Sequence, residues 1–175
     1  MPAGVQRANV PGGVEFRALT PADAYLSSKL AELEIVSWGY QLDPVRAAGR
    51  AERLAKQIRA TRQTEAAIFV AQRSDELVGL CRVARDEQRA NQWLLFGLAV
   101  HPAHRRRGIA TRLVHACIEC ARKGGATVVR CETHASNLPS VRLHERLGFE
   151  NQGQFTDSDG DEKVAFRLRL DRTGT

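Results

Sequence analysis

LLFGLAVHPAHRRRGIATRLVHACIECA, residues 94–121, is the stretch that decides the fold of this 175-residue chain. Its first seven residues form a mainly apolar run of the length of a buried strand, which His101-Pro102 ends. Beyond the proline, apolar residues recur along one face of a helix, at Ile109, Leu113, Ala116, Cys117, Cys120 and Ala121. The stretch therefore predicts a strand, a short basic turn and a helix.

The turn Arg105-Arg106-Arg107-Gly108 has the composition of an anion site. The first N–H groups of a helix have no internal partners, and together with the helix dipole they attract negative charge. Gly108 lets an anion approach the main chain because it has no Cβ. The three arginines add positive charge, so we expect an anion to bind where the helix begins.

Two motifs carry a resemblance to a known family. Val100-His101-Pro102 followed by Arg105-x-x-Gly108-x-Ala110 resembles the acyl-CoA-binding motif of the GNAT acetyltransferase superfamily, Gln/Arg-x-x-Gly-x-Gly/Ala. Asn137-x-x-Ser140, with a helical segment that closes on Gly148-Phe149, resembles the second signature of that family. The two motifs occur in the right order and spacing, and the resemblance is specific over residues 94–149.

The resemblance and the periodicity together predict the architecture. We expect an α/β (α+β) fold: one GNAT domain over residues 14–175, preceded by a flexible tail at residues 1–13. Its mixed, mostly antiparallel sheet has six to seven strands, splayed between the fourth and fifth, with about four helices on both faces. Expected strands span residues 14–19, 66–71, 77–84, 94–100, 127–132, 149–155 and 164–170, and expected helices residues 21–36, 43–61, 109–123 and 137–147. Gly97, inside a strand, indicates a bulge.

Composition restricts the class of protein and its partners. No 18-residue apolar run spans a membrane and no secretory signal is visible, so we expect a cytoplasmic protein without a membrane partner. The net charge of +6 suits an acidic partner, and coenzyme A and nucleic acid both qualify. Aromatic residues make up only 6% of the chain and the arginines lie in a strand–turn–helix context, which favours coenzyme A over nucleic acid.

No metal site is expected. The pair Cys117 and Cys120 has no second Cys or His pair at zinc-finger spacing, so core packing is the favoured interpretation and a redox role the alternative. The acidic turn at residues 157–162 lacks the glutamate that closes a calcium loop of the EF-hand type, which favours a solvated hairpin.

The resemblance implies that acetyl-CoA is the co-substrate. Main-chain groups of the central strand would bind the pantetheine arm, and N–H groups of the turn would bind the pyrophosphate. Asn137 would contact the cofactor arm, cap its helix, or do both. The expected cofactor-binding residues are Leu98, Ala99, Val100, Arg105, Arg106, Arg107, Gly108, Ile109, Ala110, Thr111, Asn137, Ser140 and His144.

Two residues are candidates for catalysis. The family commonly has a tyrosine four residues before the glycine of the Gly-Phe pair, as general acid for the leaving thiolate. This chain has His144 there, which either donates that proton or only fills space beside the thiol. Glu132, at the end of the fifth expected strand, is the candidate general base, with the neighbouring His134 or a chain of water molecules as the alternative.

The acceptor side is less defined. Trp38 and Tyr40 lie between the first two expected helices, a region that often lines the acceptor site in this family. They would contact the acceptor or simply pack that loop onto the sheet.

The expected function is N-acetyl transfer from acetyl-CoA to a primary amine, by direct transfer in a ternary complex. The amine belongs to a small molecule or a protein, and a homodimer is possible because dimers are common in the family. The alternative is a non-catalytic module that binds or senses acyl-CoA, since the tyrosine is missing and no carboxylate lies on the central strand.

Overall fold

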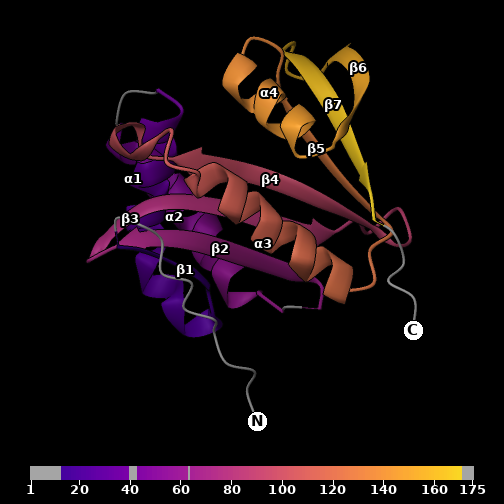
Figure 1. Cartoon of the computed structure of the whole chain (residues 1–175). Helices are drawn as coiled ribbons and strands as arrows, with labels where there is room; N and C mark the ends of the chain where they lie inside the picture. Colours follow the sequence, from indigo (N-terminus) through magenta and orange to yellow (C-terminus); the bar gives the residue numbers. More distant parts are fainter. Residues whose placement is uncertain (1–12, 40–42, 63, 171–175) are drawn as a thin grey trace.

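A seven-stranded sheet forms the centre of the molecule, with strand order β1-β2-β3-β4-β5-β7-β6 (Figure 1). The computed structural model describes residues 13–39, 43–62 and 64–170. The strands are β1 (Val14–Ala18), β2 (Ala66–Arg73), β3 (Glu76–Arg85), β4 (Gln92–Val100), β5 (Val128–His134), β6 (Glu150–Thr156) and β7 (Glu162–Arg169). The helices are η1 (Pro21–Leu26), α1 (Ser27–Ser37), α2 (Pro44–Arg59), η2 (Pro102–His104), α3 (Ile109–Lys123) and α4 (Leu138–Arg146). The number of strands agrees with the fold predicted from the sequence.

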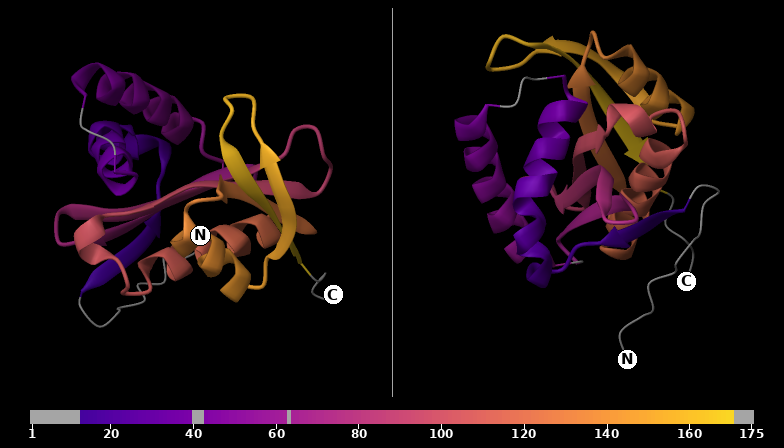
Figure 2. Two further views of the ribbon diagram at one scale, coloured as in Figure 1. Left: turned by 90° about the horizontal axis from the view of Figure 1, so that it is seen from above. Right: turned by 90° about the vertical axis from the view of Figure 1, so that its left-hand side faces the viewer.

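Helices cover both faces of the sheet. Helices α1 and α2 lie on one face, and α3 and α4 lie on the other (Figure 2). Each face has its own apolar cluster: Leu30, Leu54 and Leu80 belong to the cluster under α1 and α2. Trp93 and Leu113 belong to the cluster under α3. The four cysteine side chains are all buried in this second cluster, as the packing interpretation predicts.

The central strand β4 leaves its neighbour soon after it begins. It pairs with β5 in parallel at only three positions, from Gln92 with Val128 to Leu94 with Arg130. All other neighbouring strands in the sheet pair antiparallel. The second half of β4 therefore has no partner on the β5 side among the described residues, which is the predicted splay.

A bulge occurs in β4 where the sequence predicted one. Leu80 of β3 pairs with Ala99 and Arg82 with Phe96, so two β4 residues stand opposite Cys81. One of the two, Gly97, has a φ of +64°, which a residue with a side chain rarely adopts. The bulge redirects the last residues of β4 at the point where the strands separate.

One predicted helix needs correction, and the predicted tail lies almost wholly outside the described residues. The helix expected over residues 21–36 begins as the 3-10 helix η1 and becomes α-helical only at Ser27. The reason is local: Pro21 follows Thr20, whose amide and hydroxyl both bind the Asp23 carboxylate in a tight first turn. The expected tail, apart from Gly13, lies outside the described residues. Among the described helices none is both long and apolar enough to span a membrane.

Candidate functional site

The beginning of α3 has the geometry of an anion site. Gly108 precedes the helix with a left-handed φ of +76°, and a Cβ added there would meet nothing within 4 Å. The first α-helical bond is donated by the Arg112 amide to the Gly108 carbonyl. The amides of Ile109, Ala110 and Thr111 therefore precede the helix ladder and are available to an external acceptor. The open space in front of Gly108 allows that acceptor to come close.

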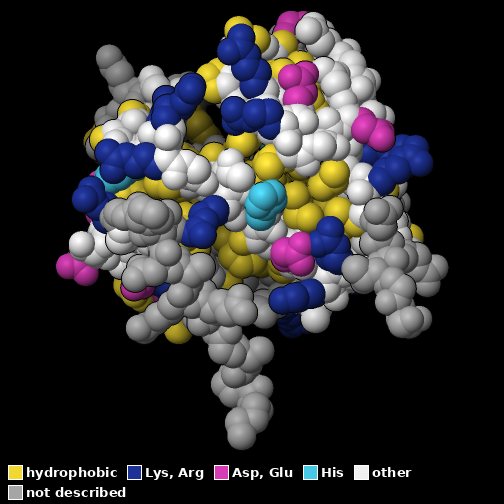
Figure 3. All heavy atoms as spheres, viewed as in Figure 1, with side chains coloured by type: hydrophobic (Ala, Val, Ile, Leu, Met, Phe, Trp, Pro, Cys, Tyr) yellow, Lys and Arg dark blue, Asp and Glu magenta, His cyan; other side chains and the backbone are white. Residues whose placement is uncertain are grey.

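The three arginines of the turn have different roles. Arg105 donates from Nη2 to the Ser37 carbonyl at 2.5 Å and from Nε to the Val100 carbonyl at 3.3 Å. Its guanidinium thus ties the end of α1 to the end of β4. The Arg105 amide also has a partner, since it donates to the Pro102 carbonyl at 3.3 Å. Arg106 and Arg107 are exposed. Figure 3 shows Lys and Arg side chains gathered around a hollow in this region of the surface, between the start of α3 and α4 of Figure 1.

Leu98, Ala99 and Val100 form the part of β4 that has left β5. Two of their carbonyls are already occupied: Trp38 Nε1 donates to the Leu98 carbonyl at 3.3 Å, and Arg105 takes the Val100 carbonyl. A cofactor arm that lies along this segment would therefore have to bind main-chain groups other than these two carbonyls.

Trp38 lies at the junction between α1 and the splayed strand. Besides its bond to Leu98, its ring is covered by the Arg50 guanidinium at 4.7 Å from the centroid, and 37% of the residue is exposed. It packs against β4 and still presents a surface to solvent, so both interpretations of Trp38 remain compatible with its position. Tyr40, the other expected acceptor residue, lies outside the described residues.

His144 is buried on α4, with 2% of its surface exposed. Its ring stacks on Phe166 at 5.4 Å and meets Phe149 edge-on at 5.3 Å. Nδ1 lies 2.8 Å from the Ser140 carbonyl, and because a carbonyl only accepts, Nδ1 carries the proton. Nε2 is buried without a hydrogen-bond partner among the described residues.

Protonation of His144 is disfavoured. Burial lowers its pKa from the ordinary value of 6.5, and the hydrogen bond to the Ser140 carbonyl opposes this shift only in part. At neutral pH the imidazole is therefore uncharged, with Nε2 as an acceptor. A buried acceptor without a partner is uncommon in folded proteins, so Nε2 is the atom of His144 that could still accept a hydrogen bond.

Asn137 caps α4. Its Oδ1 accepts a hydrogen bond from the Ser140 amide at 3.3 Å, so Asn137 is the N-cap of the helix, which is one of the roles predicted for it. The Ser140 hydroxyl lies 3.4 Å from His144 Nδ1. Both residues thus hold the helix turn that orients His144, while their expected contacts with the cofactor stay predictions.

Glu132 projects from the same sheet face as α1 and α2. Val129 and Cys131 of β5 belong to the apolar cluster under α3, so the alternation of side chains along the strand puts Glu132 on the opposite face of the sheet. Glu132 is exposed, as is much of Phe96. The carboxylate is therefore on the side of the sheet opposite α3 and α4, and open to solvent.

A buried ion cluster that was not predicted from the sequence lies beside this face. Glu34 on α1 is fully buried and accepts from Arg82 Nη2 at 2.5 Å and from Arg50 Nη1 at 2.8 Å. Arg82 also bonds the Gln57 side chain at 2.9 Å and covers the Phe96 ring at 4.9 Å. A signal existed in the sequence, since Arg82 is the one charged residue inside the apolar run 77–84. Its partner Glu34, 48 positions earlier in the chain, lies in no comparable apolar run that would have marked it as buried.

The ion cluster explains why Gly97 has no side chain. A Cβ on Gly97 would overlap the Arg82 guanidinium, so a larger residue at this position would displace the arginine from its buried place. The shape of the splayed segment of β4 thus depends on residues from α1, α2 and β3.

The fold and this site define a class of fold, in which a central strand splays beside the N-terminus of a helix that a glycine precedes. The sequence model of the acetyltransferase (GNAT) family matches residues 30–149, most of the chain. The chain belongs to the acetyltransferase (GNAT) family.

Individual relatives agree with this assignment. N-acetyltransferase 8B of Rattus norvegicus is 37% identical over 81 residues, which are 46% of this chain and 36% of that protein. The chain thus spans about a third of the length of the curated relatives it matches.

Solved structures share the fold over nearly the whole chain. The Salmonella typhimurium protein yncA, determined with its cofactor acetyl-CoA, superposes with a TM-score of 0.68 at 20% identity, covering 93% of this chain and 97% of that one. The PaiA N-acetyltransferase of Thermoplasma acidophilum, in complex with coenzyme A, also has a TM-score of 0.68, at 18% identity, covering 89% and 99%.

Proposed function

We propose that this protein transfers an acetyl group from acetyl-CoA to a primary amine, directly within a ternary complex. The observation that carries the proposal is the uncapped start of α3: Gly108 leaves open space in front of three main-chain amides, beside the strand that has separated from β5. A pyrophosphate fits this place chemically, since it brings acceptor oxygens and negative charge to unpaired donors at the positive end of a helix. Arg106 and Arg107 add charge at the entrance.

The splayed strands would accommodate the rest of the co-substrate. The half of β4 that has no β5 partner offers a main-chain edge along which an extended pantetheine arm would lie. A main-chain N–H near Val100 would then polarise the thioester carbonyl and stabilise the oxyanion of the tetrahedral intermediate. Holding the amine and the thioester together in this site supplies much of the expected rate acceleration.

The reaction requires two proton movements. The amine nitrogen forms a bond to the carbonyl carbon, the carbon–sulfur bond breaks, the nitrogen loses a proton and the thiolate gains one. Glu132 is placed on the open α1/α2 face and is the candidate acceptor of the amine proton, directly or through water.

His144 would serve the thiolate. Nδ1–H is fixed on the Ser140 carbonyl, so Nε2 is the atom that exchanges protons. An imidazolium whose pKa burial has lowered below 6.5 is a stronger acid than a thiol of ordinary pKa near 8.5, so it would transfer its proton to the departing sulfur. In the resting enzyme the ring is neutral, and the proton has to reach Nε2 during the reaction. This replaces the role that tyrosine commonly has in the family.

The test is acetyl-CoA binding to a Gly108→Trp variant by calorimetry. The indole would fill the open space and block the α3 amides. Loss of two charge-assisted hydrogen bonds, at about 1.5–3 kcal/mol each, weakens binding by at least about 100-fold. Gly125→Trp is the matched control. Gly125 lies beyond the other end of α3, has a similar φ of +84°, and likewise has nothing within 4 Å of an added Cβ.

Each outcome separates the hypotheses. Loss of affinity in Gly108→Trp but not in Gly125→Trp supports the proposed site. Equal affinity of Gly108→Trp and the parent would remove the basis of the proposal. If the parent binds acetyl-CoA yet releases no thiol with any amine of a broad panel, and His144→Ala changes nothing, the chain is the non-catalytic acyl-CoA-binding module.

A further inference from the structure

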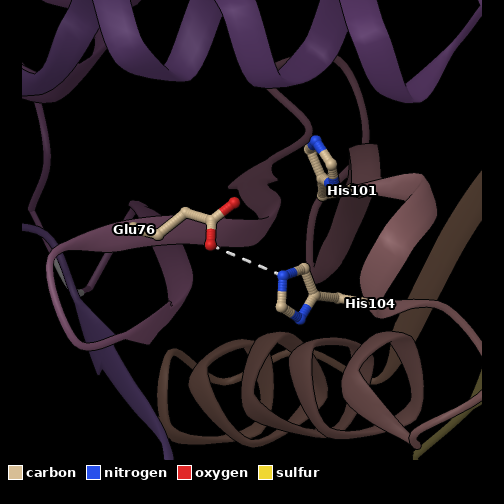
Figure 4. A group of neighbouring side chains, drawn as sticks. All are labelled: Glu76, His101 and His104. Carbon is tan, nitrogen blue, oxygen red and sulfur yellow. Dashed lines mark ion pairs between the residues drawn. The ribbon is translucent and has the colours of Figure 1, made fainter.

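Three potential metal ligands meet on the edge of the molecule away from α4. Glu76 begins β3, directly after the β2–β3 hairpin, and His101 and His104 follow the end of β4. One ligand atom of each residue lies within 4.8 Å of the other two. Figure 4 shows the Glu76 carboxylate and the His104 ring pointing toward one another, with His101 on the same side. Segments separated by 25 positions in the sequence thus supply two imidazoles and one carboxylate to one place.

The spacing of two of these atoms suits a shared metal ion better than a hydrogen bond. His104 Nε2 and Glu76 Oε2 are 3.5 Å apart. A charge-assisted hydrogen bond between them would measure about 2.7–2.9 Å. Two ligands on one tetrahedral zinc ion, each about 2.0–2.1 Å from the metal, lie about 3.4 Å apart.

The His104 side chain is buried inside the fold. Its side chain is only 8% exposed, whereas that of Glu76 is 57% exposed. His104 Nδ1 is buried without a hydrogen-bond partner among the described residues, so no hydrogen bond there accounts for placing an imidazole inside the fold. His101 Nδ1 accepts a long bond of 3.2 Å from the Ala103 amide, which is the contact that His101 would give up on coordinating an ion.

The site opens onto a groove. A groove of about 710 Å³ runs between α1 and the β2–β3 hairpin, and Glu76 and His101 line it. Its other charged residues are two cations and two carboxylates, Lys29, Arg73, Glu32 and Asp75. An ion can therefore enter from solvent, and a water molecule can reach the coordination position that the protein leaves open.

We propose that Glu76, His101 and His104 bind a divalent ion of the zinc type, with water as the fourth ligand. Two imidazoles and a carboxylate form a donor set that zinc accepts in proteins. Since His101 and His104 lie directly before the Arg105–Gly108 turn, the ion would tie the β2–β3 hairpin to the segment that leads into the start of α3. No metal was expected from the sequence, because cysteine pairs and acidic loops are local patterns, whereas these three ligands come from distant segments.

The experiment measures Zn²⁺ bound by the untagged full-length chain after EDTA treatment, by equilibrium dialysis without coenzyme A, whose thiol would itself bind zinc. One equivalent is expected. Glu76→Gln and His101→Gln should each weaken binding by at least about tenfold. These two positions are chosen because one is exposed and the other partly so, whereas replacing the buried His104 would endanger folding. Co²⁺ provides a second readout, as visible absorption bands of a low-coordinate site that the two variants lose.

Controls use the other exposed histidines. His115→Gln, on the exposed face of α3, should leave Zn²⁺ binding unchanged. His134→Gln tests the neighbourhood of Asp161, which lies 4.0 Å from His134 Nδ1. The proposal is overturned if the parent retains no more Zn²⁺ than the Glu76→Gln/His101→Gln double variant, or if His134→Gln removes the bound ion instead. Neither result depends on acetyl-CoA, so this test is independent of the proposed enzymatic function.

Discussion

Replacing Glu34 with alanine tests the buried ion cluster. The Glu34 side chain is 0% exposed, and it neutralises Arg82, whose side chain is 11% exposed, and Arg50, at 29%. Removal of Glu34 leaves the Arg82 charge buried with only the neutral Gln57 amide and the Phe96 ring as partners. Breaking a buried pair in this way costs about 3–5 kcal/mol of unfolding free energy. Most of the loss comes from Arg82, because Arg50 reaches solvent.

The measurement is urea unfolding followed by circular dichroism, with thermal unfolding as a second readout. For a chain of this size, a loss of about 3–5 kcal/mol lowers the Tm by about 6–20 °C. Glu32→Ala is the matched control: Glu32 is exposed on the same helix, and its replacement should change stability by no more than about 0.5 kcal/mol.

A paired replacement separates charge from packing. Glu34→Leu combined with Arg82→Met removes both buried charges and keeps side-chain volume, so it should recover most of the stability that Glu34→Ala loses. The reasoning fails if Glu34→Ala costs less than about 1 kcal/mol, or if the double variant is as unstable as the sum of its single variants.

Two further predictions follow from the same region and from α4. Gly97→Ala should lower the unfolding free energy by about 2–5 kcal/mol in urea, because its Cβ meets the anchored Arg82 guanidinium at a left-handed φ. Gly108→Ala has open space around its Cβ and should lower the unfolding free energy by only about 1–2 kcal/mol. Equal losses in the two variants would contradict this prediction. The pKa of His144 is lowered in the folded state, so the unfolded state binds the proton first as pH falls. Unfolding free energy should therefore decrease below pH 6.5, by up to about 1.4 kcal/mol per pH unit, until the folded-state pKa is passed. His144→Phe should flatten this slope, and an unchanged slope would rule out His144 as its source.

Local patterns of the chain were sufficient for most of the fold. Alternating and helical periodicity located the seven strands and the α-helices to within a few residues, and glycine chemistry located the Gly97 bulge. These features follow from a residue and its near neighbours. The exception, the 3-10 start at Pro21, arose because Asp23 fixes the first turn through its own side chain.

The site was only partly accessible from the sequence. The motif at residues 105–110 located the open start of α3, but it did not predict that the Arg105 guanidinium binds the carbonyls of Ser37 and Val100. The hydrogen bond from Trp38 Nε1 to the Leu98 carbonyl joins positions that are 60 residues apart in the chain. Such contacts depend on how α1 packs on the sheet, which no local pattern encodes.

The sequence by itself determined the order of strands and helices, the glycine positions that permit left-handed backbone, and the family motifs, since these depend on short-range sterics and periodic burial. Only the tertiary structure decided that His144 is a buried neutral acceptor, that Glu34 joins two arginines under the splayed strand, and that Glu76 meets two histidines. The physical reason is that burial and charge pairing are properties of the space between elements, and chain folding alone brings those elements together.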